Sequence, residues 1–182
     1  MPLMTSPFAS RLTKTFLYLL VLGGVVWLGS SLVRMVVGFD VFVPGTLQVK
    51  EQAEVARLQT IRLHTLLGMW TDWSFLLCTI GAVGTIILLG RTYKRYGWML
   101  MCAVLFVLVV PVQAWVAWYD FRLFMLFDGV SGASLAPTAE IVDVFLHRQQ
   151  NAILNICSGL ALLSGFTIVT LAVWRPLHRY ES

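Results

Sequence analysis

Four long runs of apolar residues divide the chain, at 15–37, 66–90, 97–119 and 152–174. Each supplies the roughly 20 residues that an α-helix needs to cross the ~30 Å hydrocarbon core of a bilayer. The runs are continuous and do not alternate between apolar and polar residues, so they predict helices and not the strands of a barrel. We therefore expect an all-α integral membrane protein with four transmembrane helices in one membrane domain that covers residues 1–182.

The composition strengthens this prediction. The chain is 58% hydrophobic and 12% charged, whereas a soluble domain carries about 25% charged residues. Its seven Trp residues fall near the ends of the runs, as expected for side chains that prefer the membrane interface. The first run is longer than the apolar region of a signal peptide and has no small-residue cleavage pattern, so we expect it to be retained as a helix.

Charge along the chain predicts an orientation. Seven basic residues lie in the two terminal segments and in the connection after the second run, where the one acid is Glu181. The positive-inside rule then places both termini in the cytoplasm, as in a bacterial inner membrane, or in the matrix of a mitochondrial inner membrane. We attribute the net charge of +4 to this orientation signal. We expect no nucleic-acid partner, because no basic stripe interleaves with exposed aromatic residues.

The two halves of the chain share residues at a nearly constant offset. An offset of 88 residues aligns Trp27 with Trp115, Arg34 with Arg122, Phe39 with Phe127 and Asp40 with Asp128. An offset of 86 aligns Ala53 with Ala139, Glu54 with Glu140 and Arg62 with Arg148.

We interpret these matches as an internal duplication into two tandem, parallel-repeat helical hairpins, at about 15–90 and about 97–174. The alternative is that two membrane hairpins share interface chemistry by chance. Parallel repeats are related by an axis along the membrane normal, so Arg34 and Arg122 should lie at equal depth on diagonal helices of a four-helix bundle.

The two outer connections should contain short interfacial helices. In the first, Thr46 is placed to cap a helix that begins near Leu47. In the second, Pro137 suits the first turn of a helix, and Glu140 and Asp143 suit its positive end. We expect both helices to lie at the outer interface or to run directly into the returning span.

Charged residues at the outer ends of the spans predict a network that occurs once in each repeat. The first copy would join Arg34, Asp40, Glu54 and Arg62, and the second would join Arg122, Asp128, Glu140 and Arg148. One interpretation is that these ion pairs fasten the outer connections to the bundle. The other is an anion site for a lipid phosphate or a carboxylate substrate, because the guanidinium group of Arg binds such groups through two hydrogen bonds.

Asp72 is an acid inside a predicted span, which by default suggests a function. It could carry a proton or bind a cation, pair with Arg34 or Arg122, or lie at a wet surface. It has no equivalent in the second half of the chain, where Ser158 aligns with it.

Two His residues raise the question of a redox cofactor. His64 and His147 precede the second and fourth runs, and a haem b held by two His residues is one arrangement that a four-helix bundle allows. A quinone pocket formed by Trp70 and Trp73 beside Asp72 or His64 is another hypothesis. The three Cys residues have no metal-type spacing, so we expect no metal site and interpret Cys78, Cys102 and Cys157 as small packing residues.

The sequence contains no catalytic pattern, so an enzymatic activity of this chain alone is not expected. We expect a non-catalytic membrane subunit that packs into and stabilises a larger energy-converting or transport complex of an inner membrane. Its partners would be other membrane subunits and bound lipids. The alternatives are a redox subunit that binds haem b or quinone between the hairpins, and a small homo-oligomeric transporter or channel that uses Asp72.

Overall fold

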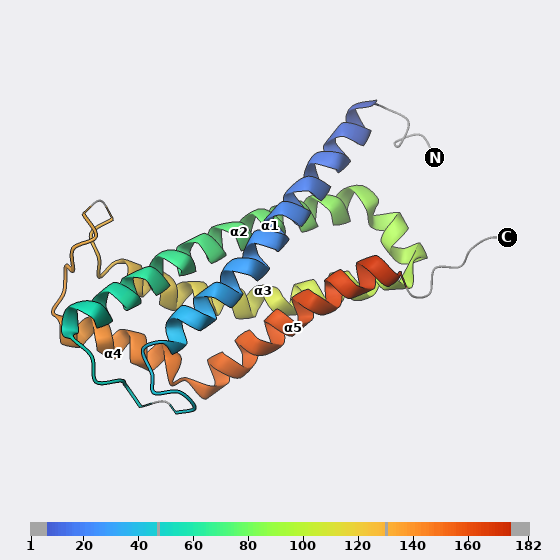
Figure 1. Ribbon diagram of the computed structural model, residues 1–182. Helices are drawn as coiled ribbons and strands as arrows, with labels where there is room; N and C mark the ends of the chain where they lie inside the picture. The colour runs from blue at the N-terminus through green and yellow to red at the C-terminus, as the bar shows by residue number, and fades with distance from the viewer. Residues whose placement is uncertain (1–6, 47, 130, 176–182) are drawn as a thin grey trace.

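The computed structural model describes residues 7–46, 48–129 and 131–175, with the backbone alone at 7–10 and 91–95. Within these ranges the chain forms five α-helices and no strand (Figure 1). The helices are α1 (Pro7–Phe39), α2 (Glu54–Arg95), α3 (Gly97–Phe124), α4 (Thr138–Gln149) and α5 (Ala152–Trp174). The all-α prediction is therefore confirmed.

Four helices are long and apolar enough to cross a membrane: Arg11–Phe39, Glu54–Gly90, Gly97–Phe124 and Ala152–Trp174. They contain the four apolar runs. Large apolar side chains cover the outside of the bundle, with Val36 and Ile87 exposed by 69% and 73%. A soluble protein rarely exposes so much contiguous apolar surface, so the fold is compatible with a multi-pass membrane protein.

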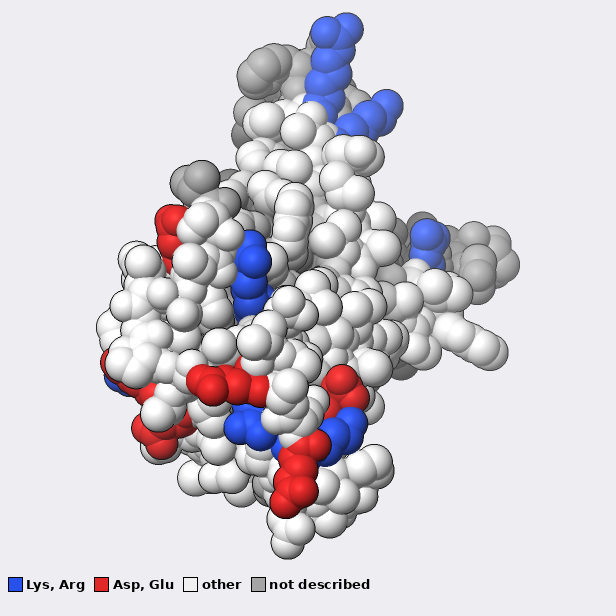
Figure 2. All heavy atoms as spheres, turned by 60° about the vertical axis from the view of Figure 1, so that its left-hand side comes forward, with Lys and Arg blue, Asp and Glu red and all other residues white. Residues whose placement is uncertain are grey.

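The four long helices pack in the order α1, α2, α3, α5, and α1 touches α5 only sparsely. Helices α1 and α3 are therefore diagonal partners. The start of α1, the turn between α2 and α3 and the end of α5 lie at one end of the molecule (Figure 1). The short helix α4 and the connections 40–53 and 125–137 lie at the other, which we name the α4 end. Figure 2 shows acidic and basic side chains mixed at the α4 end and only basic ones at the start of α1.

Glycines bring α1 and α2 into close contact. A Cβ atom on Gly81 would lie 2.4 Å from the backbone nitrogen of Leu20, and one on Gly23 would lie 2.6 Å from the backbone nitrogen of Cys78. Backbone atoms cannot rotate away as a side chain can, so these positions exclude a larger residue. Gly29 differs from them, because nothing lies within 4 Å of a Cβ built there.

An apolar cluster holds the α4 end together. It contains Val41, Phe42, Ile61, Leu123, Phe127, Ile141 and Phe145. The cluster joins both outer connections to α2, α3 and α4, because each connection contributes a buried Phe. Burial of aromatic side chains is the main stabilisation expected where the backbone is irregular.

The two outer connections fold into matching turns. In the first, the Val43 nitrogen donates to the Gln48 oxygen, and in the second the Asp128 nitrogen donates to the Ala133 oxygen, both at 2.8 Å. Phe42 faces Val49 across the first turn as Phe127 faces Ser134 across the second. These pairs are offset by 85 residues, so the turns match but the predicted offset of 88 does not hold for them.

Of the two short helices predicted in the outer connections, the structure shows the second. Helix α4 begins at Thr138, directly after Pro137. The prediction that a helix begins near Leu47 is wrong, because α2 begins at Glu54. From there it runs without a break into the span. Thr46 closes a turn instead: its hydroxyl donates to the Val43 oxygen at 3.0 Å and accepts from the Gln48 nitrogen at 3.2 Å.

We predict that Gly81→Ala lowers the free energy of unfolding by about 1–3 kcal/mol, since its Cβ would overlap the backbone of α1. The melting temperature of the protein in mild detergent measures this effect. Gly29→Ala is the matched control on a helix face with free space, and it should change stability by at most about 1 kcal/mol. Equal melting temperatures for the two variants would contradict the close packing of α1 on α2.

Candidate functional site

The centre of the bundle is polar although its outside is apolar. The buried polar residues are Arg34, His64, Thr65, Thr71, Ser74, Thr85, Gln113 and Asp120. Polar groups taken out of water are unfavourable unless they find hydrogen-bond partners, so each of these side chains needs an explanation. Most of the Thr and Ser hydroxyls find one within their own helix, as when Thr85 donates to the Gly81 oxygen. The remaining side chains contact one another across the bundle.

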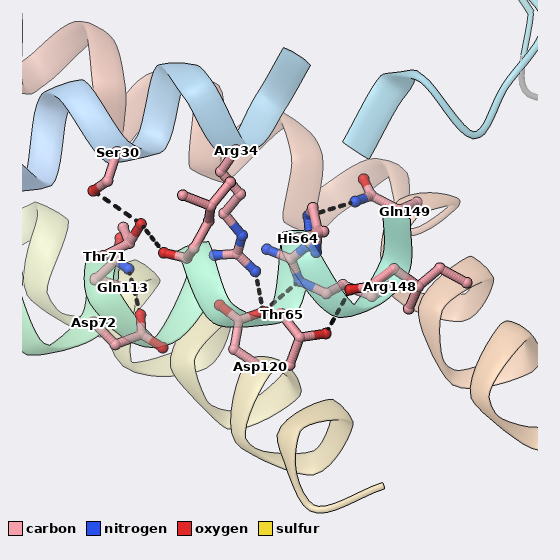
Figure 3. A network of polar contacts seen from close by, with 12 residues as sticks. Ser30, Arg34, His64, Thr65, Thr71, Asp72, Gln113, Asp120, Arg148 and Gln149 are labelled. Atoms are coloured by element: carbon pink, nitrogen blue, oxygen red, sulfur yellow. Dashed lines mark hydrogen bonds and ion pairs between the residues drawn. The ribbon is translucent and has the colours of Figure 1, made fainter. Parts of the chain in front are cut away.

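Three charged side chains meet near the α4 end, and we name them the charge triad: Arg34 from α1, Asp120 from α3 and Arg148 from α4. Arg34 Nη2 donates to Asp120 Oδ1, and Arg148 Nε lies 3.0 Å from the same oxygen (Figure 3). The Asp120 side chain is fully buried, and the two arginines are 6% and 11% exposed. Two cations thus share one anion, which leaves the triad one positive charge in excess.

A glycine on α2 makes room for the triad. A Cβ atom on Gly68 would lie 3.0 Å from Arg34 Cζ and 3.3 Å from Asp120 Cγ. Both distances are tighter than ordinary contacts, so a side chain at this position would push against the ion pair. Gly68 therefore lets the guanidinium of Arg34 pass close to α2 on its way to α3.

His64 lies beside the triad. Its Nε2 atom is 3.1 Å from both Arg148 Nη1 and Gln149 Nε2, and its ring stands edge-on to Phe145. A guanidinium can only donate hydrogen bonds, so Nε2 must accept and the proton of the neutral ring lies on Nδ1. That Nδ1 atom is buried and has no partner in the described part of the chain.

A second polar group lies deeper along the same diagonal. Trp27 Nε1 donates to Gln113 Oε1 at 3.3 Å, and Gln113 Nε2 donates to Asp72 Oδ1 at 3.0 Å. Trp27 and Arg34 are seven residues apart on α1, as are Gln113 and Asp120 on α3. Seven residues are about two helical turns, so both diagonal contacts form on the same helix faces.

A cavity of about 260 Å³ opens between α1 and α5 beside the triad; we name it the α1–α5 cavity. Arg34, His64 and Arg148 line it at the α4 end, and Trp27 lines it further in. The α5 side consists of Asn155, Ser158, Gly159 and Leu162. The Nε atoms of Arg34 and Arg148 and the Nδ1 atom of His64 are buried and have no hydrogen-bond partner in the described residues, so three residues that line the cavity keep unused donors.

Another cavity, of about 380 Å³, lies between α2 and α3, and we name it the Asp72 cavity. Asp72 is the one charged side chain on its wall, which is otherwise mostly apolar and includes Trp73, Phe75 and Phe121. Gln113 lines both cavities. The α1–α5 cavity and the Asp72 cavity therefore share one amide side chain.

Arg148 keeps its charge at neutral pH. Burial and, to a smaller extent, the positive charge of Arg34 lower the pKa of its guanidinium to about 10, although Asp120 and Asp72 act in the opposite direction. A pKa of about 10 is still far above neutrality, so the triad retains its excess positive charge there.

The structure does not assemble the eight predicted network residues into two equivalent networks. Arg34 points inward to Asp120, while Arg122 is exposed, so these two residues do not occupy equivalent surroundings. Asp40 pairs instead with Lys50 at 2.8 Å at the surface, and Asp128 bonds within its own turn to the Ser131 nitrogen at 3.0 Å.

The other members of the predicted networks lie apart. Glu54, Arg62, Arg122 and Glu140 are exposed and form no ion pair with the described residues. Arg62 packs over Gly132, whose positive φ of 67° places the turn beneath the guanidinium. Only Arg34 and Arg148, one from each predicted network, are brought together.

The structure also shows where the residues predicted to bind a quinone, a proton or an ion lie. Asp72 contacts Gln113 rather than Arg34 or Arg122. Trp70 and Trp73 are 65% and 61% exposed on the outside of the bundle.

His147 is exposed and lies beside the ring of Tyr119, with 6.2 Å between the ring centroids. His64 already uses Nε2 for Arg148 and Gln149, so this geometry does not present the two His residues as a pair of haem ligands. Within the described residues no three His, Cys, Asp or Glu side chains group as for a metal.

Sequence reasoning missed Asp120, Gln113 and Gln149. Asp120 lies one residue beyond the predicted end of the third run, where an acid looks like an ordinary interfacial residue. The signal that could have found it is the spacing of seven residues from Gln113 to Asp120, which repeats the spacing from Trp27 to Arg34.

No protein-family model, curated protein or solved structure matches this chain. Its function is therefore argued from the two cavities and from the charges around them.

We predict that Asp120→Asn lowers the free energy of unfolding by about 3–5 kcal/mol, because it leaves two buried guanidiniums without an anion. Asp40→Asn is the control, since it breaks an exposed ion pair and should cost at most about 1 kcal/mol. Thermal unfolding in mild detergent measures both. If the double variant Asp120→Asn, Arg148→Met were no more stable than Asp120→Asn alone, the proposed electrostatic cause would be wrong.

Proposed function

We propose that this chain is a multi-pass membrane protein that binds the anionic head of an amphipathic molecule in the α1–α5 cavity. The observation that carries the proposal is the charge triad, in which two buried guanidiniums at the cavity wall share the one carboxylate of Asp120. A second anion would complete the pairing of charges.

Membrane insertion is supported by the four long apolar helices and by the apolar outer surface. Arg11 and Lys14 near the start of α1 and Arg175 after α5 lie at the end opposite α4. By the positive-inside rule that end faces the cytoplasm, and the α4 end, with the triad, faces outward from an inner membrane. The matching turns of the two outer connections support an origin by tandem duplication of a hairpin.

The chemistry of the cavity wall suits a carboxylate or a phosphate. A guanidinium offers parallel N–H donors that fit two oxygens of such an anion. Arg34 and His64, which line the cavity, each keep a buried donor, Nε–H and Nδ1–H, that has no partner in the described residues. The amides of Gln149 and Asn155 lie on the same wall, so an anionic head would meet donors from four helices.

The shape of the site favours an amphipathic ligand over a small free anion. A volume of about 260 Å³ is slightly below the usual range for a whole drug-sized ligand, so the cavity fits a head group with little room for a tail. Contacts between α1 and α5 are sparse, and Asn155 and Gly159 are exposed on the cavity rim. An apolar tail can therefore leave between the two helices toward the membrane.

The sparse contact between α1 and α5 also favours a second candidate function, that of a packing subunit in a larger membrane complex. Short residues on α5, such as Ser158 and Gly159, allow a helix of another chain to approach closely. The mass of the particle extracted in mild detergent from its native membrane separates the candidates. Co-purification with other polypeptides would support the subunit, and a particle of this chain alone would leave the ligand site as the function.

The ligand proposal is tested by titrating the purified protein with phosphatidylglycerol and counting bound lipids by native mass spectrometry. Arg148→Met should weaken binding by about tenfold or more, because it removes a charged hydrogen-bond donor from the site. Arg122→Met removes the same charge from an exposed position near the same end of the bundle and should leave binding unchanged. Zwitterionic phosphatidylcholine should bind weakly to all three proteins.

A second variant keeps the test valid if Arg148→Met fails to fold. Gly159→Leu places a side chain at the cavity rim, where a Cβ meets no other atom, and should also weaken binding. Oleate in place of phosphatidylglycerol distinguishes a free carboxylate from a lipid head group as the source of the anion. Binding of a neutral quinone in the absence of anion binding would refute the proposal and favour the redox hypothesis.

A further inference from the structure

The charged side chains around the α1–α5 cavity and the Asp72 cavity influence one another. Four charged side chains lie in or beside the centre of the bundle: Arg34, Arg148, Asp120 and Asp72. Together they are formally neutral, but only three of them are joined as ion pairs. Asp72 has no cation within ion-pairing distance in the described part of the chain, and its hydrogen-bond partner is the uncharged amide of Gln113.

Asp72 lies close enough to the triad to influence it. It is one helical turn, about 6 Å along the axis, from Gly68, and Gly68 packs directly against Arg34 and Asp120. Asp72 interacts electrostatically with Asp120, Arg34 and Arg148, and such interactions are strong where the surroundings exclude water and salt. The negative charge of Asp72 therefore partly offsets the excess positive charge of the triad.

Gln113 links Asp72 to the α1–α5 cavity by hydrogen bonds. Its amide oxygen accepts from Trp27, which lines that cavity, so its NH₂ group is turned toward Asp72. Gln113 itself lines both cavities. A change of charge at Asp72 thus acts on the α1–α5 cavity both through space and through a fixed side chain (Figure 3).

We propose that binding of an anion in the α1–α5 cavity is coupled to protonation of Asp72. This inference rests on the proposed anion site. With the cavity empty, ionised Asp72 balances the triad and the buried charge is zero. With an anion bound, the anion balances the triad, and Asp72 must take up a proton for the buried charge to return to zero. One proton therefore binds with each anion.

Coupling of this kind is reciprocal: a proton on Asp72 raises the affinity for the anion, and the anion favours the proton by the same factor. A membrane protein with this property holds an anion only together with its proton, as a proton-coupled anion carrier requires. The other groups that face the site are Arg34 from α1, His64 from α2, Asp120 from α3 and Arg148 from α4. Of these, His64 is the other side chain that can bind a proton, so the experiment must separate it from Asp72.

The test measures the affinity for phosphatidylglycerol, whose phosphodiester keeps its charge throughout, from about pH 5 to about pH 8. The affinity of the wild-type protein should fall as the pH rises and Asp72 ionises, by about 5- to 150-fold. Asp72→Asn mimics the protonated acid and should bind tightly over the whole range. Asp143→Asn, which removes an exposed carboxylate on α4, should titrate like the wild-type protein.

The outcomes separate this inference from the proposed function. If the affinity of Asp72→Asn depends on pH as that of the wild-type protein does, the coupling to Asp72 is refuted. Tight binding by the wild-type protein at every pH, still weakened by Arg148→Met, would refute the coupling and leave the anion site intact. Absence of binding at any pH would overturn the anion site and the coupling with it.

A second measurement covers the case in which Asp72→Asn does not fold. Addition of phosphatidylglycerol to the wild-type protein in weakly buffered solution near neutral pH should cause proton uptake, which an indicator dye reports. Phosphatidylcholine should cause none. Anion binding without proton uptake anywhere between about pH 5 and about pH 8 would refute the coupling.

Discussion

The carboxylate of Asp120 has to be neutralised, because it is fully buried in a bundle whose surroundings are apolar. An isolated charge in such a place is strongly unfavourable. Arg34 and Arg148 supply the compensation from α1 and α4, and the arrangement of the α4 end follows from it. Helix α1 must bring Arg34 past Gly68, and α4 must lie across the bundle so that Arg148 reaches α3.

The same ion pairs explain why a bundle with an apolar outside has a polar centre. Once Asp120 and its arginines are buried, neighbouring polar groups such as His64 and Gln149 gain partners. The apolar cluster around Phe42 and Phe145 closes the α4 end over them. Below the triad, Trp27 and Gln113 repeat the diagonal contact two turns away. Polar contacts thus hold α1 to α3, while close glycine packing holds α1 to α2.

We interpret the triad as a ligand site because it has an excess positive charge and unused hydrogen-bond donors. A purely structural cluster would tend toward equal numbers of cations and anions in contact, and this one pairs two with one. The balancing acid, Asp72, lies in a separate cavity and hydrogen-bonds to a neutral amide. That separation would let a bound anion replace the Asp72 carboxylate in balancing the triad, while Asp72 takes up a proton.

The sequence by itself determined the helices, because a run of about 20 apolar residues can span a bilayer as a helix, in which the backbone groups bond within the run itself. It also indicated that Arg34 and Arg148 matter, through the polar residues at the ends of the spans. The sequence could not show that both arginines pair with Asp120. Comparing the two halves matched Arg34 with its own kind, Arg122, whereas an ion pair joins opposite charges, here Arg34 and Asp120, 86 residues apart. Which residues meet across a diagonal depends on how the helices pack and rotate about their axes, and only the tertiary structure decided that.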